Sequence, residues 1–451
     1  LKYSEKKIGK LEKKNEKSAE EFLQKFKEPR LLYNACIGSV ASSKTYKLNL
    51  QLHELRKTKI KSEKQKFNNK PVCWTTWRQF STSASDKARK EVFDEFIKQV
   101  PRISPVIKEK FEVSAKIYDS YGTDPLQDYL EEHKISSEHL KNVLLQLREG
   151  LKDKFSEEFN YYTQKFLKRE PKYYDDFYYM RNIVYHDLIK EFGKINGLDH
   201  CKKTMIQLGL NPQEIKIDDK DRPKKYPSPF ASFIKIPTDI RVSYKMENPL
   251  NTTTAIYHEL GHAIHASHIK KELPYWQKYL MSNGLAESFS IFFESLLLNE
   301  EYLTKELKLS KKFAEEFIAR TKFVETYSIA FYTGNSLFRI KYWEDKMKFE
   351  DCDEEYAKQL KASMNMNIPG AYWQLHHILP ESLMYVPSYM LAMIRAREMH
   401  KHLENEYGMQ WWKNKEAGKY ILELIEPGTE SANADFETID PTEYIEFMTH
   451  D

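Results

Sequence analysis

The hydrophobic and polar positions of this chain follow mainly the period of amphipathic helices. Over residues 85–170 and again over residues 301–363, apolar side chains recur every three or four positions, as on a helix with one buried face. Ser85 stands where an N-cap belongs, and Pro101 and Pro105 are expected to end this first helix. Glycine is scarce, with 14 residues in 451, while Lys, Glu and Leu are frequent. The pattern predicts a mainly α-helical protein.

A strand pattern is clear in one region of the sequence. Residues 233–236 form a short apolar run, and residues 239–245 then alternate between polar and apolar side chains. This alternation places Asp239, Arg241 and Ser243 on one face of a strand. We therefore expect short strands just before the segment that carries the chemistry described below.

A charged, polar stretch at residues 218–225 separates two parts of different character. The stretch before it is helical and rich in aromatic residues, whereas the strands and the histidine motif follow it. We place a domain boundary there, giving an N-terminal helical lobe of residues 1–225 and a second lobe of residues 226–451.

The strongest chemical signal is a histidine pair at residues 258–262, which read His-Glu-Leu-Gly-His. Residues four apart share one face of a helix, so His258 and His262 can offer ring nitrogens to one metal ion. Glu259 lies one position further round and is placed to act as a general base toward a water on that metal. The motif predicts a catalytic zinc helix.

A catalytic zinc site needs a third protein ligand from another element. The next predicted helix, over residues 285–298, carries Glu287 and Glu294 on one face, seven residues apart. Glu287 is the candidate third ligand. Glu294, two turns further on, is placed to hydrogen-bond a ligand histidine from behind. The alternative is that both are solvated charges on an exposed helix face.

Composition narrows the function classes. The net charge of +4 is small for a chain of this length and gives no argument for nucleic acid. No apolar run is long enough to span a membrane, and no signal peptide core is visible. The four cysteines are far apart and form no Cys-x-x-Cys pair, which disfavours disulfides and predicts a cytoplasmic protein; they are Cys36, Cys73, Cys201 and Cys352.

Several segments together resemble known metallopeptidases. The zinc helix His-Glu-Leu-Gly-His-Ala-Ile-His resembles that of the thimet-oligopeptidase-like family. Other segments are more similar to the carboxypeptidase Taq family: Asp239-Ile-Arg241-Val-Ser243, Glu287-Ser-Phe-Ser290, Gln374 with His377, and Tyr385-Val-Pro387-Ser-Tyr389. The resemblance covers residues 228–395.

This resemblance implies a particular fold, a metal cofactor and a class of substrate. It implies two helical lobes around a deep substrate groove, with a small β-sheet beside the zinc-binding helix. It also implies one zinc ion per chain, for which Co²⁺ or Mn²⁺ can substitute, and peptide substrates. In the Taq group such enzymes are often homodimers.

The resemblance also implies roles for five further residues. His377, Tyr385 and Tyr389 would donate hydrogen bonds to the oxyanion that forms during hydrolysis. Asp239 and Arg241 would bind the substrate, with Arg241 holding its terminal carboxylate. The alternative for Arg241 is a salt bridge with Asp239.

Three hypotheses about function remain open from the sequence. The favoured one is a zinc metallopeptidase that releases C-terminal residues from peptides. The second is an oligoendopeptidase that cleaves within short peptides. The third is a helical binding protein that has kept a vestigial metal site.

Overall fold

Helices make up most of the protein. The structure, a computed structural model, describes residues 5–26, 29–57, 66–67, 70–73, 85–175, 184–222, 225–226, 229–246, 248–376, 378–380 and 382–450. Within these ranges the strands form one two-stranded and one three-stranded sheet. The predicted mainly α-helical fold with a small sheet is confirmed. None of the described helices has the length and apolar character needed to cross a membrane.

The chain divides into two compact units, each assembled from three stretches of sequence. The first unit comprises Leu1–Glu132, Asn160–Val184 and Phe331–Val386; the second comprises His133–Phe159, Tyr185–Ala330 and Pro387–Asp451. The boundary expected between residues 225 and 226 falls inside the second unit. Helices α7 (Ser137–Phe166) and α15 (Lys311–Glu344) each contribute to both units, so a change in composition along the sequence does not coincide with this division.

The first unit is built from helices, with a short two-stranded ribbon. Its elements, besides parts of α7 and α15, are α1 (Glu5–Lys25), α2 (Arg30–Arg56), β1 (Lys66–Phe67), β2 (Lys70–Pro71), α4 (Asp86–Ile97), α5 (Val100–Ser120), α6 (Pro125–His133), α16 (Cys352–Met364) and the 3₁₀ turns Tyr173–Asp175, Phe349–Asp351 and Gly370–Gln374.

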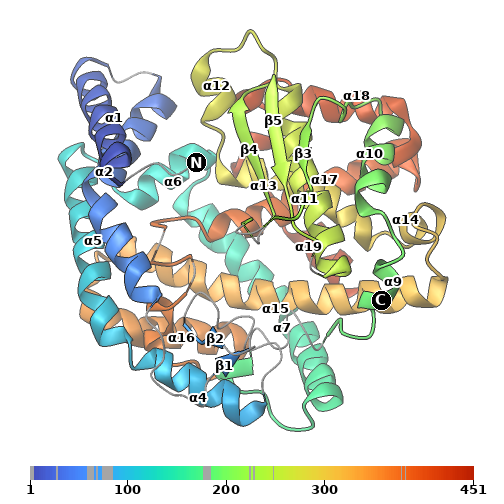
Figure 1. Cartoon of the computed structure of the whole chain (residues 1–451), viewed down its shortest axis with the longest axis horizontal. Helices are drawn as coiled ribbons and strands as arrows, with labels where there is room; N and C mark the ends of the chain where they lie inside the picture. The colour runs from blue at the N-terminus through green and yellow to red at the C-terminus, as the bar shows by residue number, and fades with distance from the viewer. Residues whose placement is uncertain are drawn as a thin grey trace. The chain divides into compact units, whose positions relative to one another are not determined.

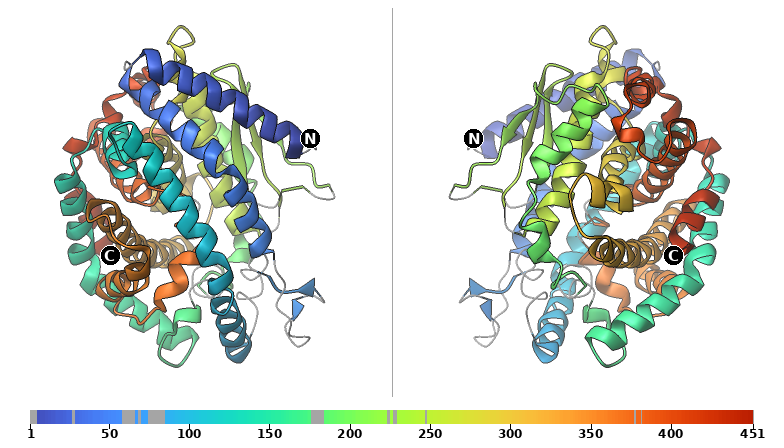
Figure 2. Two further views of the ribbon diagram at one scale, coloured as in Figure 1. Left: turned by 90° about the vertical axis from the view of Figure 1, so that its left-hand side faces the viewer. Right: turned by 90° about the vertical axis from the view of Figure 1, so that its right-hand side faces the viewer.

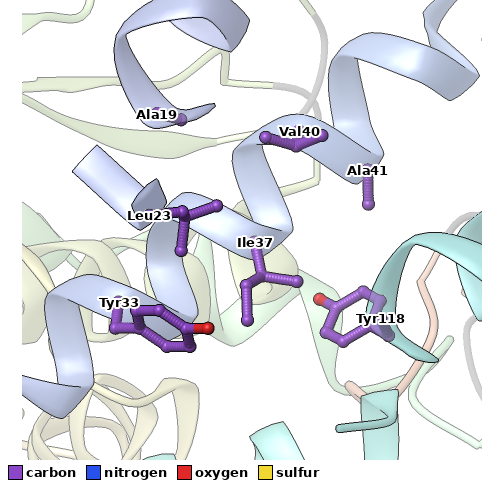
Figure 3. Packing of buried hydrophobic residues seen from close by; sticks show 7 residues of the cluster. All are labelled: Ala19, Leu23, Tyr33, Ile37, Val40, Ala41 and Tyr118. Atoms are coloured by element: carbon purple, nitrogen blue, oxygen red, sulfur yellow. The ribbon is translucent and has the colours of Figure 1, made fainter. Parts of the chain in front are cut away.

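Helices α1, α2 and α5 pack side by side in this unit (Figure 2). Figure 3 shows the apolar cluster that joins them, in which Ile37 of α2 lies between Leu23 of α1 and Tyr118 of α5. Ile37 is completely buried. Burying an aliphatic side chain of this size contributes about 1.5–3 kcal/mol to folding. The remaining buried members are Ala19, Tyr33, Val40 and Ala41.

The predicted start and end signals of the helix that follows Ser85 have different outcomes. Ser85 caps α4, since its hydroxyl accepts a hydrogen bond of 3.3 Å from the Ala88 amide, as predicted. Helix α4 ends before Pro101, which occupies the first turn of α5, where an amide donor has no helical partner. The expectation that Pro105 ends a helix is wrong, because it lies inside α5.

The second unit holds the histidine motif. Its elements, besides parts of α7 and α15, are α9 (Ile189–Phe192), α10 (Gly197–Gln207), β3 (Lys216–Asp218), β4 (Phe230–Lys235), β5 (Asp239–Ser243), α11 (Pro249–His268), α12 (Tyr275–Tyr279), α13 (Asn283–Glu294), α14 (Glu300–Lys305), α17 (Pro387–Tyr407), α18 (Lys415–Ile425), α19 (Thr442–Thr449) and the 3₁₀ turns Ser295–Leu298, Trp411–Lys413, Gly428–Glu430, Ala432–Ala434 and Phe436–Thr438.

A three-stranded sheet with the order β3-β5-β4 lies beside α11 (Figure 1). β4 and β5 are antiparallel, with Ser232 opposite Arg241, and correspond to the predicted strands. β3 pairs with β5 in parallel. No strand was expected here, because β3 ends at Asp218, the first residue of the charged stretch. Among the described strands, β4 has a neighbour on one side only, which makes it an edge of this sheet.

Candidate metal centre

Helix α11 carries the histidine motif, and its first turn is set by Asn248 and Pro249. The Asn248 side chain accepts hydrogen bonds from the amides of Leu250 and Asn251, at 3.1 and 3.3 Å. Pro249 follows in the first turn, where its fixed φ suits a helix start. The helix then continues without interruption to His268, so the two motif histidines lie on one face, as predicted.

Gly261 allows α13 to approach α11 closely. A Cβ atom at Gly261 would lie 2.7 Å from the Phe289 carbonyl oxygen and 2.7 Å from Ser290 Cα, which is too close for any other residue. The glycine inside the motif therefore has a packing role. It lets α11 and α13 cross at the point where Glu287 lies next to the two histidines.

His258, His262 and Glu287 come together at this crossing. Their candidate ligand atoms all lie within 4.8 Å of one another, and no other group of three such residues does so in the described part of the chain. Glu287 Oε2 is 3.4 Å from His258 Nε2 and 3.6 Å from His262 Nε2. Glu287 is buried, and both histidines are partly buried. The structure thus brings the three predicted ligands together.

The outer nitrogen of His258 is held by Glu294. His258 Nδ1 and Glu294 Oε2 are 2.8 Å apart, a hydrogen bond that leaves Nε2 directed at Glu287. This is the position predicted for Glu294 from its spacing. A carboxylate behind a ligand histidine fixes the ring and raises its basicity.

Two further contacts around the ligands were not predicted. The Ala286 carbonyl accepts a hydrogen bond from the His262 ring. Ser290 donates to Glu287 Oε2 at 3.2 Å and to the Glu287 carbonyl at 2.9 Å, which orients the carboxylate. Ser290 was identifiable from its place on the same helix face as Glu287, whereas a backbone carbonyl leaves no signal in the sequence.

Glu259 lies next to the ligands and contacts the edge of the sheet. The backbone of Ala231 in β4 hydrogen-bonds to its carboxylate. Burial raises the pKa of Glu259, while the positive charge of His258 and the Ala231 bond act in the opposite direction. Glu287 and Glu294 are the carboxylates that contact the His258 ring, and the role of Glu259 as general base stays a prediction.

The electrostatics of this centre favour a positive charge. Burial lowers the pKa of His258, but the hydrogen bonds to Glu287 and Glu294 outweigh it, and the net pKa lies well above its usual value. Burial and the neighbouring His258 lower the pKa of His262 to about 4, so this ring is neutral at pH 7. Two carboxylates around two histidines therefore provide a site suited to a cation.

The spacing of the ligand atoms also fits zinc. Bonds of about 2.0–2.1 Å at tetrahedral angles separate ligand atoms by about 3.3–3.4 Å. The two measured separations from Glu287, 3.4 and 3.6 Å, are close to this value. Two nitrogens and one carboxylate oxygen are also the donor set of many catalytic zinc sites, which keep one position for water.

Arg241 and Asp239, the predicted substrate-binding pair, form an ion pair with each other. Arg241 Nη2 is 2.7 Å from Asp239 Oδ2, and Lys216 Nζ is 3.0 Å from Asp239 Oδ1. The salt bridge weighed as the alternative for Arg241 is therefore present. Arg241 is exposed, and two cations share one carboxylate, so the cluster retains net positive charge. Substrate binding by these residues stays a prediction.

The three predicted oxyanion donors remain predictions. His377 lies outside the described residues. Tyr385 is partly buried and belongs to the first unit, whereas the metal ligands belong to the second. Tyr389 lies in the first turn of α17, a helix that packs against α13 within the second unit.

Comparison with known proteins places the fold. The sequence matches no protein-family model and no curated protein. PZ peptidase A, solved with an inhibitor, is 13% identical with a TM-score of 0.63, covering 98% of this chain and 84% of that one. Metallocarboxypeptidase 1 of Trypanosoma cruzi is 15% identical with a TM-score of 0.56, covering 99% and 88%. A protein assigned as oligoendopeptidase F of Bacillus anthracis is 13% identical with a TM-score of 0.61, covering 98% and 82%.

These similarities show that the chain has the fold of carboxypeptidases and oligoendopeptidases. The resemblance inferred from the sequence motifs is confirmed at the level of the fold. Fold and centre together define a mainly α-helical protein of the metallopeptidase fold with a His-His-Glu candidate metal site.

Proposed function

We propose that this protein is a zinc-dependent peptidase. His258, His262 and Glu287 hold the metal, and Glu259 is the general base. The observation that carries the proposal is the convergence of these three ligand side chains within 4.8 Å, with Glu259 adjacent to them on α11. Cobalt or manganese can be held by the same ligands.

The chemistry that zinc supplies when bound is Lewis acidity toward water and toward a carbonyl oxygen. The chain supplies the proton transfers. Glu259 takes a proton from the attacking water and passes it to the leaving amine as the peptide bond breaks. The Ala231 bond holds the carboxylate in place for both steps. Glu294, through His258, keeps one ligand ring in its orientation.

The edge strand β4 supports a peptide as substrate. Its Ala231 contacts Glu259, and within the described ranges the strand has a sheet partner on one side only. An extended peptide that adds to such an edge pairs through its backbone, independent of its side chains. A peptide held in this way passes close to the general base.

Two modes of cleavage are possible, and they differ in whether the protein binds the C-terminal carboxylate of the substrate. Release of C-terminal residues is the favoured mode, with Arg241 binding the terminal carboxylate. Cleavage within short peptides is the second, and the Arg241–Asp239 ion pair favours it, because the guanidinium already has a carboxylate partner. Structures of both kinds of peptidase share the fold.

The test combines metal analysis with peptide cleavage. Purified protein is expected to hold about one zinc-class metal ion per chain. It is also expected to cleave peptides in a mixture, and mass spectrometry identifies the products. A chelator should remove both metal and activity, and added zinc should restore them. Protein that binds no metal and cleaves no peptide would instead be the helical binding protein with a vestigial site.

Matched substrates separate the two modes. A peptide with a free C-terminus and the same peptide with an amidated C-terminus are compared with wild-type protein and the Arg241→Ala variant. If Arg241 binds the C-terminal carboxylate, wild-type protein should cleave the amidated peptide more slowly than the free one. The Arg241→Ala variant should then have a raised KM for the peptide with a free C-terminus. Equal rates for both peptides, with products from internal bonds, identify an oligoendopeptidase.

A further inference from the structure

Arg339 in the first unit is a buried cation with unused hydrogen-bond donors. It lies on α15 with 1% of its surface exposed. Its Nη2 donates to the Leu379 carbonyl at 2.6 Å. Its Nε and Nη1 atoms are buried and have no hydrogen-bond partner among the described residues. Buried donors without a partner are rare in folded proteins, because each one forfeits its bonds to water.

Aromatic rings surround this guanidinium. Its central carbon lies 4.7 Å from the ring centroid of Phe111, 5.5 Å from Phe338, 5.6 Å from Tyr342 and 5.8 Å from Trp373. Ring faces attract a cation. A ring face accepts only a weak bond from an N–H group, so Nε and Nη1 still lack a strong acceptor.

A comparison with Arg320 on the same helix shows what Arg339 lacks. Arg320 is also buried, at 4% exposed, and its guanidinium pairs with both Asp187 and Glu316. No carboxylate of the described residues forms a salt bridge or hydrogen bond with Arg339. Its buried charge has no counter-charge among them.

Two more cations are held in the same region of the first unit. Arg56 Nη2 donates to the His376 carbonyl at 2.9 Å, and Lys110 Nζ donates to the Pro380 carbonyl at 2.9 Å. With Arg339 on Leu379, three buried cations thus bind carbonyls of residues 376–380. The Leu379 carbonyl dipole stabilises the charge of Arg339 but does not neutralise it.

Arg339 remains charged under physiological conditions. Burial lowers its pKa to about 10, which still leaves it protonated at pH 7. A water molecule can satisfy an N–H donor, but only an anion also compensates the charge, whose burial without a partner is costly. One turn earlier on the same helix, the buried Ser336 hydroxyl also has no hydrogen-bond partner in the described part of the chain and can donate a further hydrogen bond.

We propose that Arg339, together with Ser336, forms a binding site for a small inorganic anion of the chloride class. The anion accepts hydrogen bonds from Nε or Nη1 of Arg339 and from the Ser336 hydroxyl. Four aromatic rings lie within 5.8 Å of the guanidinium carbon. The site shares no residue with the candidate metal centre and stabilises the first unit.

Thermal unfolding of the full chain tests this site without reference to enzymatic activity. The Tm is measured in sodium chloride, sodium bromide and sodium gluconate at equal ionic strength. The expected result is a saturable rise of about 1–3 °C with either halide relative to gluconate. Arg339→Gln should abolish the rise. The matched control Arg320→Gln removes a buried arginine that already has carboxylate partners and should keep it.

Bromide diffraction locates the ion independently of any variant. Crystals of wild-type protein in bromide should show an anomalous peak within hydrogen-bond distance of Arg339. A Tm response that is absent, or equal for halide and gluconate, overturns the proposal. So does a bromide peak elsewhere with only water at Arg339. If Arg339→Gln fails to fold, the wild-type halide response and the bromide position decide together.

Discussion

The Nδ1 atom of His258 and the Oε2 atom of Glu294 are 2.8 Å apart, so a carboxylate two turns beyond Glu287 holds the His258 ring. This bond leaves Nε2 as the ring nitrogen that faces Glu287. Glu294→Ala is expected to weaken zinc affinity by about 10–100-fold, the usual effect of losing such a partner. A competition titration with a fluorescent zinc chelator measures it. The exposed Glu315→Gln on α15 is the control, and equal affinities in both variants would contradict the role of Glu294.

Glu259→Gln should separate metal binding from catalysis. The amide has the shape of the carboxylate but cannot accept the proton of the attacking water. We expect unchanged zinc content and a fall in kcat of at least about 100-fold, the contribution of a positioned general base. Peptide cleavage at saturating substrate and metal analysis of the same sample provide the two values. Retained activity would show that another group is the base.

Gly261→Ala should disturb the crossing of α11 and α13. Its Cβ would meet backbone atoms of Phe289 and Ser290 at 2.7 Å, and backbone cannot move aside as a flexible side chain does. We expect a loss of about 1–3 kcal/mol in the free energy of unfolding and weaker zinc binding, since Glu287 shifts with α13. Urea unfolding and zinc titration measure these effects.

Gly38→Ala is the matched control for this substitution. A Cβ at Gly38 in α2 would meet only the Tyr118 hydroxyl, at an ordinary distance of 3.6 Å. Alanine is a better helix former than glycine, so stability should rise by up to about 1 kcal/mol with zinc binding unchanged. A similar loss of stability in both variants would argue against a specific helix crossing at Gly261.

Glu325 on α15 makes the stability of the protein depend on pH. It lines a cavity of about 40 Å³ with Tyr444, Arg397 and His400. Burial raises its pKa to about 8, and the nearby charge of Glu294 adds to the effect, while Tyr444 and Lys322 act in the opposite direction. The folded protein therefore binds a proton here between about pH 4.5 and pH 8 that the unfolded chain releases.

The sign of this effect follows from the proton count. Because the folded state holds more protons in that window, the stabilising contribution present below pH 4.5 is lost as the pH rises toward 8. Glu325→Gln cannot ionise and should be more stable than wild type at pH 8, with little difference near pH 4.5. Urea unfolding across this range measures the difference, and parallel curves for the two proteins would contradict it.

The three candidate ligands that the structure brings together, His258, His262 and Glu287, were identifiable from the sequence alone. The His258–His262 spacing, the position of Glu259 and the seven-residue interval between Glu287 and Glu294 are properties of single helices. Helical periodicity is local, so a side chain's face follows from its position in the chain. The Ser85 cap and the strands β4 and β5 were predictable for the same reason.

Tertiary structure decided which of these faces meet. The discontinuous units, the parallel strand β3 and the closeness of Gly261 to α13 depend on segments far apart in sequence. The contacts of Ala231 and Ala286 with the centre are made by backbone atoms, which every residue carries. The pairing of Arg241 with Asp239 and the isolation of Arg339 depend on which charges folding brings together. Periodicity gives the direction of a side chain, but only packing gives its neighbour, and the neighbour sets its chemistry.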